Sequence, residues 1–368
     1  MEKVRAFLAR KNITFSAKRY FIDAMSAMAQ GLFCTLLVGT ILDTIGKQFG
    51  IGFLTDTFLT IKQGDVTFYY TIGGFCSLMV GPAMAVAIGK ALEAPPLVLF
   101  SLITVGFATN VLGGTGGPLA VFFVAILAAE VGKAISKETK IDILVTPIVT
   151  ILAGIGFAAL VARPIGTAAT SVGDAIKWAT ELQPFFMGIL VSVIIGVALT
   201  LPISSAAICA ALGLTGLAGG AAVAGCCAQM VGFAVMSFRE NRWGGLAAQG
   251  LGTSMLQMGN IVRNPRIWIP PTLAAAITGP VATCLFRLEM NGAPVSSGMG
   301  TCGLVGQIGV YTGWVNDVAS GAKAAVTGMD WLGLVLISFV LPAVLTWLIA
   351  IPLRKWGWIK DGDLKLDL

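Results

Sequence analysis

The feature that most constrains this chain is an apolar run near its C-terminal end, residues 332–353, which contains no charged side chain. A helix needs roughly 20 apolar residues to cross the hydrocarbon layer of a membrane. Only 11% of the residues are charged and 56% are hydrophobic, whereas soluble domains carry about 25% charged residues. We therefore expect an integral membrane protein and exclude a soluble enzyme and a nucleic-acid binder.

Apolar runs of this kind recur along the whole chain. Because each is long enough for most or all of a crossing, the sequence predicts an all-α polytopic membrane protein with about ten transmembrane helices. The run 206–217 is short for a full crossing. The predicted spans are residues 20–45, 68–88, 96–112, 119–135, 141–161, 185–201, 206–217, 221–238, 267–286 and 331–353.

Basic residues flank the predicted spans in a consistent pattern. Positively charged flanks stay on the cytoplasmic side of a membrane. Both termini and the loops after the fourth and eighth spans are therefore predicted to be cytoplasmic, which requires an even number of crossings. The basic residues are Lys3, Arg5, Arg10, Lys11, Lys18 and Arg19 before the first span, Lys133, Lys137 and Lys140, then Arg239 and Arg242, and finally Arg354, Lys355, Lys360 and Lys365.

The chain contains no histidine, which removes the usual general base, the usual metal ligand and any phosphohistidine. Its seven cysteines lack the spacing of a zinc site, and we interpret them as small buried apolar residues. We therefore predict no metal, no cofactor and no catalytic residues.

A polar stretch between two strong apolar runs divides the chain most clearly. Its apolar positions can form one helix face, with the polar positions turned to water, as in a helix that lies in a membrane interface. The predicted parts are an N-terminal membrane lobe (1–162), an interfacial linker helix (163–183), a C-terminal membrane lobe (184–353) and a cytoplasmic tail (354–368).

Two segments of the C-terminal lobe, residues 244–266 and 289–313, are rich in glycine, amides and hydroxyls. Irregular backbone survives at membrane depth only where it is buried in protein or lines a water-filled cavity. We expect re-entrant hairpins with broken helices, which are the places where transporters bind their substrates. The alternative is a pair of extramembrane loops.

The polar groups of these segments are the candidate solute ligands. Glu289 opens the second segment, and carboxylates and amides can bind the hydroxyls of a polyhydroxylated solute. The alternative for Glu289 is a structural ion pair with Arg287. We expect the candidates from both segments to surround one buried cavity. The candidates are Glu289, Asn291, Ser296, Ser297, Thr301, Gln307, Gln257 and Asn260.

Three sequence elements resemble a known family. They are Gly-Thr-Ser-Met-Leu-Gln-Met (252–258), Asn-Pro-Arg-Ile-Trp-Ile-Pro-Pro (264–271) and Gly-Met-Gly-Thr-Cys-Gly-Leu-Val-Gly-Gln (298–307). They are similar to stand-alone enzyme IIC-like proteins of the sugar phosphotransferase system, including its toxin-regulator-like branch. The resemblance implies a homodimer in a bacterial inner membrane, with ten spans, two re-entrant hairpins, a dimerising N-terminal lobe and a transport lobe.

The chain also departs from that family. Sugar-binding enzyme IIC proteins generally use a histidine and a hairpin glutamate, but this chain has no histidine and carries no glutamate at Gly300-Thr301. No segment outside the predicted spans is long enough for a IIA or IIB domain. Any phosphorylation of the solute would therefore need a separate cytoplasmic IIB-type partner.

We predict a membrane permease, not an enzyme, that moves a small polar solute by movement of the C-terminal lobe. The solute class that fits the candidate residues is a carbohydrate or a derivative. Two alternatives stay open. One is an ion-coupled secondary transporter with Glu289 or Asp317 as proton carrier, and the other is a membrane sensor that binds a ligand without transport.

The basic flanks generate a prediction of topology. A cysteine introduced into either terminal segment should react with a membrane-impermeant thiol reagent only after the cells are permeabilised, because both termini are cytoplasmic. The parent chain with its native cysteines gives the background. Labelling of either terminus in intact cells would contradict the assignment and the even number of crossings.

Overall fold

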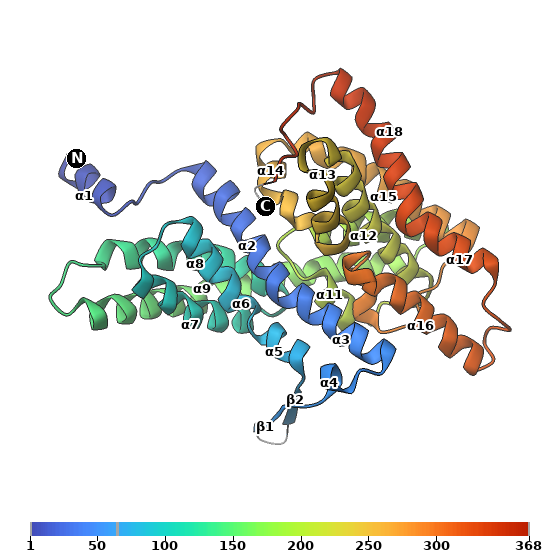
Figure 1. The fold of residues 1–368 in the computed structure, drawn as a ribbon, viewed down its shortest axis with the longest axis horizontal. Coiled ribbons are helices and arrows are strands. Elements are labelled where there is room, and N and C mark those ends of the chain that lie inside the picture. Colours follow the sequence, from blue (N-terminus) through green and yellow to red (C-terminus); the bar gives the residue numbers. More distant parts are fainter. Residues whose placement is uncertain (1, 64–65, 367–368) are drawn as a thin grey trace. The chain divides into compact units, whose positions relative to one another are not determined.

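The computed structural model describes residues 2–63 and 66–366. Within them the regular secondary structure is helical except for one antiparallel hairpin, β1 (Leu59–Gln63) with β2 (Val66–Tyr70), in which Leu59 pairs with Tyr70. The helices are α1 (Glu2–Arg10), α2 (Met25–Leu32), α3 (Val38–Phe49), α4 (Gly52–Thr55), α5 (Ile72–Leu78), α6 (Val80–Ala91), α7 (Pro96–Gly113), α8 (Gly117–Ile135), α9 (Asp142–Thr180), α10 (Pro184–Thr200), α11 (Ser205–Ala211), α12 (Gly216–Met236), α13 (Phe238–Ala247), α14 (Met258–Arg263), α15 (Ile269–Pro280), α16 (Val305–Ala319), α17 (Gly328–Val335) and α18 (Leu341–Lys355) (Figure 1).

Seven helices of the described chain are long and apolar enough to cross a membrane, or eight if the bent pair α5–α6 counts as one span. The prediction of an all-α polytopic membrane protein is therefore confirmed. The number of crossings stays a prediction. The seven are Arg19–Lys47, Pro96–Gly113, Gly117–Ile135, Asp142–Thr180, Gly216–Met236, Pro265–Phe286 and Gly328–Lys355.

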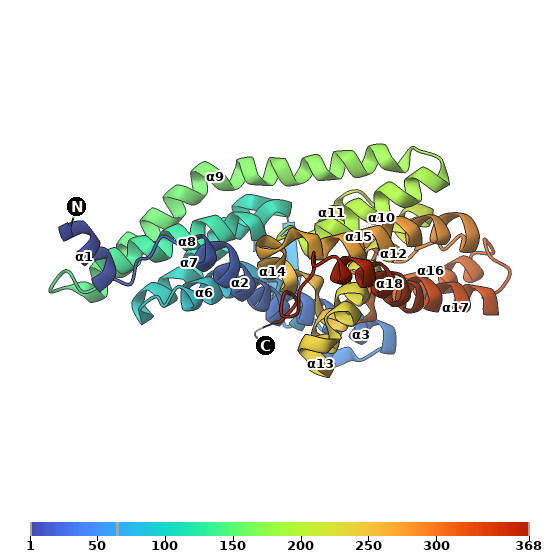
Figure 2. The same ribbon diagram turned by 90° about the horizontal axis from the view of Figure 1, so that it is seen from above.

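The chain forms two compact units. Unit 1 comprises Met1–Lys47 and Ile51–Ala169, and unit 2 comprises Gln48–Gly50 and Thr170–Leu368. Their boundary in α9 falls inside the predicted linker 163–183, but α9 runs through it as one helix of 39 residues that includes Pro164 (Figure 2). Residues 163–180 thus continue the preceding apolar helix and do not form a separate one.

In unit 1, two regions that the charge pattern assigns to the cytoplasm lie together. After α1, the Lys11 ammonium donates to the carbonyl of Ser136 and pairs with Glu138, and Arg10 pairs with Glu138 at 2.7 Å. The hydrogen bond from Lys11 and the charge of Arg10 hold the pKa of Glu138 below its usual range. The N-terminal basic segment and the loop after α8 therefore lie on one side of this unit, as the predicted topology requires.

Unit 2 is built around α12 (Figure 1), and 94% of the apolar stretch of this helix is buried inside the protein. Helices α10, α15 and α18 pack around it. Glycines allow backbones to touch here: a methyl group on Gly225 would lie 1.9 Å from the carbonyl oxygen of Ser192, and one on Gly279 would lie 2.0 Å from that of Gly188. Close approach through small residues is the usual way in which membrane helices associate.

The predicted span 206–217 is not a membrane-crossing helix. It contains all but the first residue of the seven-residue α11, a break at Gly213 with φ +60°, and the first residues of α12. A helix of seven residues is far shorter than the roughly 20 that a crossing needs. Glycine takes the left-handed conformation without strain, so Gly213 ends the helical run that the apolar composition suggested.

The two irregular segments of unit 2 have the broken backbone that the sequence predicts. Residues 244–266 form short helical turns, as do residues 294–304. Both are packed inside the unit, because Ser254, Gln257, Ser297 and Thr301 are fully buried. These parts of the segments are therefore not solvated loops, although their depth in the membrane stays a prediction.

The packing of α12 generates a stability prediction. Gly225→Ala should lower the free energy of unfolding by about 1–3 kcal/mol, because the new methyl group would displace the backbone of α10. Thermal unfolding of the purified protein in detergent measures the change. Gly156→Ala is the matched control, since an added methyl group there meets nothing within 4 Å. Equal thermal stability of the two variants would contradict the close backbone contact.

Candidate functional site

A polar pocket of about 230 Å³ lies at the N-terminal end of α12. Its residues come from the chain after the α15 span, from the end of α16 and from the loop before α17. This arrangement combines two carboxylates, an amide, two cations and an aromatic ring. The lining residues are Arg287, Glu289, Asn291, Trp314, Asp317, Ala322 and Lys323.

The backbone of residues 287–291 is held against the first turns of α12. Arg287 ends the preceding helix in the left-handed region (φ 45°, ψ 47°), a conformation that costs energy in a residue with a side chain. A methyl group on Gly220 would lie 1.7 Å from the carbonyl oxygen of Leu288. Met290 pairs with Gly216 through two backbone hydrogen bonds of 3.0 and 3.1 Å. The local fold thus fixes the positions of Glu289 and Asn291.

The amide of Asn291 connects two carboxylates. Its Nδ2 donates to Glu289 Oε2 at 3.2 Å and to Asp317 Oδ2 at 2.9 Å. Its Oδ1 accepts from the backbone N–H of Gly216 at 3.1 Å. Both polar atoms of this side chain therefore form hydrogen bonds. The carboxylate oxygens of Glu289 and Asp317 can still accept hydrogen bonds from donors outside the protein.

An aromatic ring and two cations complete the pocket. Trp314 is 3% exposed, and Lys323 Nζ lies 5.7 Å from the centre of its ring while pairing with Asp330 at 2.6 Å. Arg287 is exposed, and no ion pair connects it to Glu289 in the described chain. The geometry thus gives no support to the alternative of an Arg287–Glu289 pair.

Four other predicted residues lie in the interior of unit 2. Ser296, Ser297, Thr301 and Gln307 are buried. Thr301 Oγ1 donates to the carbonyl of Gly250 at 2.5 Å, which joins the two irregular segments. Gln307 Nε2 donates to Ser338 Oγ at 2.9 Å, while its Oε1 has no partner in the described chain. These contacts hold the second segment inside the bundle.

The last two predicted residues bind the C-terminal segment of the chain. Gln257 Nε2 donates to the carbonyl of Leu364 at 3.0 Å, and Asn260 Nδ2 donates to the carbonyl of Lys365 at 2.9 Å. Leu364 is 0% exposed and Ile359 is 2% exposed. The predicted cytoplasmic tail is therefore docked on the first irregular segment.

Two further asparagines bind the same segment. Asn241 donates to the carbonyl of Leu364 at 2.7 Å and accepts from the N–H of Leu366 at 2.8 Å. Asn264 donates to the carbonyl of Trp358 at 2.9 Å. The tail is thus held by hydrogen bonds between side-chain amides and its main-chain groups. Backbone N–H and C=O groups that leave water need such hydrogen-bond partners.

The eight predicted residues consequently do not surround one cavity. Their contacts form three groups: the pocket, the interior of unit 2 and the docked tail. The role of each in solute binding stays a prediction. Sequence reasoning missed Trp314 and Lys323 and gave Asp317 only as a proton carrier. The spacing of Trp314 and Asp317, three residues apart on one helix face, is a signal that could have found them.

Comparison with known proteins gives one match. The family model described as phosphotransferase system, EIIC, matches residues 22–366, which cover most of both units and both irregular segments. No curated protein and no solved structure matches the chain.

The docked tail generates a prediction that separates structure from solute binding. Gln257→Ala should lower the free energy of unfolding by about 1–3 kcal/mol, because buried partners lose their donor, and should leave solute affinity unchanged. Thermal unfolding and limited proteolysis of the C-terminal segment measure the effect. Gln183→Ala is the control, since Gln183 is exposed and its side chain makes no capping hydrogen bond to α10. If the two variants unfold alike, the tail contact does not stabilise the protein.

Proposed function

Because the chain belongs to the enzyme IIC family of the phosphotransferase system, whose members are its membrane sugar-transport components, we propose that it is a permease for a carbohydrate or a carbohydrate derivative. Unit 2 binds the solute in the pocket of Glu289, Asn291 and Asp317. The observation that carries this assignment is the Asn291 amide, which holds two carboxylates at 3.2 and 2.9 Å on the wall of one 230 Å³ cavity.

The groups of the pocket suit a neutral polyhydroxylated molecule. Carboxylates accept hydrogen bonds from sugar hydroxyls, and the cations Arg287 and Lys323 donate to hydroxyl oxygens. Because Lys323 already pairs with Asp330, the positive charge of the pocket does not exceed that of its carboxylates, and the pocket offers no net attraction to an anion. Glu289, Asn291 and Asp317 are partly exposed, which leaves them accessible to a solute.

The position of the pocket supports uptake from outside the cell. Asn291 lies at the Gly216 end of α12, whereas Arg354 donates to the carbonyl of Met236 at the other end. The basic residues after α12 and α18 therefore share one end of unit 2, and positively charged flanks are cytoplasmic. With that orientation, the pocket faces the outer side, where an importer first meets its solute.

The remaining steps of the proposal concern the two predicted lobes. The N-terminal lobe (1–162) forms the homodimer contact, and movement of the C-terminal lobe (184–353) carries the solute across the bacterial inner membrane. The connector 163–183 lies in the membrane interface. A separate cytoplasmic IIB-type protein supplies any phosphoryl group, because this chain has no histidine to carry one.

One specific observation favours a second candidate function. Two carboxylates, Glu289 and Asp317, share one amide donor in the pocket, and carboxylates inside transporters commonly act as proton relays. The protein would then be a proton-coupled secondary transporter that works without phosphotransfer.

Substitution of Asn291 tests the pocket. A thermal-shift screen of the purified protein against sugars, sugar acids and nucleosides first identifies the compound that stabilises it most. Asn291→Ala should weaken binding of that compound by about 1–3 kcal/mol in isothermal titration calorimetry, because the carboxylates lose their shared donor. Asn316→Ala is the matched control, an exposed asparagine of the same helix as Asp317. If the Asn291 variant binds the compound with unchanged affinity, the solute site is not this pocket.

The same compound in proteoliposome uptake separates the candidate functions. For a direct ligand, Glu289→Gln should remove most of the affinity at every pH. For a proton carrier, the variant should keep binding and exchange but lose uphill uptake. Lower thermal stability with unchanged flux per folded molecule would remove Glu289 from the site.

A further inference from the structure

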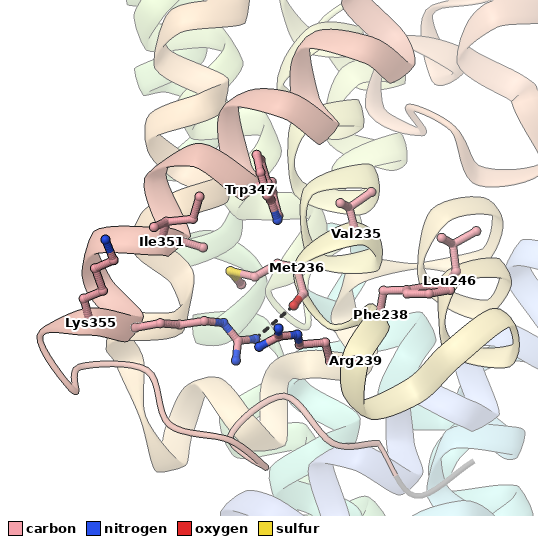
Figure 3. Close-up of a pocket in the computed structure, with 10 residues that line it drawn as sticks. Val235, Met236, Phe238, Arg239, Leu246, Trp347, Ile351 and Lys355 are labelled. Atoms are coloured by element: carbon pink, nitrogen blue, oxygen red, sulfur yellow. Dashed lines mark hydrogen bonds between the residues drawn. The ribbon is translucent and has the colours of Figure 1, made fainter.

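A second and larger cavity, of about 510 Å³, lies at the opposite end of α12 from the solute pocket. Residues from α12, α13 and α18 line it (Figure 3). Its apolar part includes Val235, Leu246, Trp347 and Ile351, and Figure 3 shows Arg239 and Lys355 at its margin. The cavity thus has an apolar side and a cationic side.

The cationic side carries two positively charged side chains that form no ion pair among the described residues. Arg354 is bound internally, since it pairs with Glu240 at 3.3 Å, pairs with Asp361 at 3.2 Å and donates to the carbonyl of Met236. Arg239 and Lys355 are exposed and have no ion pair or hydrogen bond among the described residues. One guanidinium group and one ammonium group are therefore available to bind an anion.

The surroundings place this cavity at the level of a membrane interface. Three further tryptophans lie near the same helix ends, Trp243 in α13 and Trp356 and Trp358 after α18, and they are 74%, 67% and 41% exposed. Tryptophans concentrate where the hydrocarbon layer meets the headgroups. Trp347, on the apolar side of the cavity, is itself 54% exposed, so the cavity opens to the exterior through an apolar surface.

The geometry points to a binding site for an anionic phospholipid. The headgroup phosphate binds Arg239 and Lys355, and the upper part of an acyl chain lies along Trp347 and Ile351. Basic pockets between transmembrane helices on the cytoplasmic side bind anionic headgroups in this way. A soluble phosphate fits the cations but leaves the apolar side empty, and a zwitterionic lipid fits the apolar side but brings no net charge.

Lipid titration followed by native mass spectrometry of the full chain in detergent tests the site. Dioleoylphosphatidylglycerol should bind the wild type at least about tenfold more tightly than dioleoylphosphatidylcholine. The double variant R239Q/K355Q should weaken phosphatidylglycerol binding roughly 30-fold, about 1 kcal/mol for each removed charge. Because both side chains are exposed and make no described contacts, the variant should keep the thermal stability of the wild type.

The double variant R263Q/K360Q is the matched control, since it removes one arginine and one lysine that are exposed and lie outside the cavity. It should bind phosphatidylglycerol like the wild type. The inference is overturned if both lipids bind equally well, if the two double variants bind alike, or if R239Q/K355Q keeps wild-type affinity. Displacement of the lipid by millimolar glycerol 3-phosphate or inorganic phosphate would also overturn it, since the ligand would then be a soluble anion.

Discussion

The close backbone packing of α12 is the constraint on which the C-terminal unit depends. In a membrane, apolar side chains gain little by leaving lipid for protein, so helices associate through close contact and interhelical hydrogen bonds. Methyl groups on Gly220 and Gly225 would lie 1.7 and 1.9 Å from the carbonyl oxygens of Leu288 and Ser192. These contacts fix the first half of α12 against its neighbours. One cavity of unit 2 lies at each end of this helix: the carboxylate pocket beside Gly216 and the basic cavity beside Met236.

If the protein is the proposed permease, the interior between the two cavities favours movement of the whole unit over passage of the solute through that unit. Buried hydrogen bonds cross this region, from Thr301 to the carbonyl of Gly250 and from Gln307 to Ser338. A path through unit 2 would break such bonds and leave buried partners unpaired, at about 1–3 kcal/mol for each group. Movement of the unit as a body keeps these bonds intact and changes only the side of the membrane that the pocket faces.

Sequence reasoning reached the fold class and most long helices because membrane spans leave a local signal, an apolar run of fixed minimum length. It did not reveal contacts that depend on distant partners. Nothing near Gln257 or Asn260 indicates that their amides bind carbonyls 107 and 105 residues away. The span predicted at 206–217 failed for a local reason, since Gly213 turns the chain with a positive φ. The linker 163–183 looked separate because it is polar, although α9 continues through Pro164.

The docked C-terminal segment bears on how a cytoplasmic partner would reach this protein. Ile359 and Leu364 are buried, and four side-chain amides hold main-chain groups of the same segment. Exposing those two side chains alone would cost roughly 3–6 kcal/mol. With the cytoplasmic orientation that the basic residues predict for this end of unit 2, the segment would form part of the surface that the proposed IIB-type partner meets. Such a partner must therefore either recognise the docked segment as it lies or gain enough binding free energy to displace it.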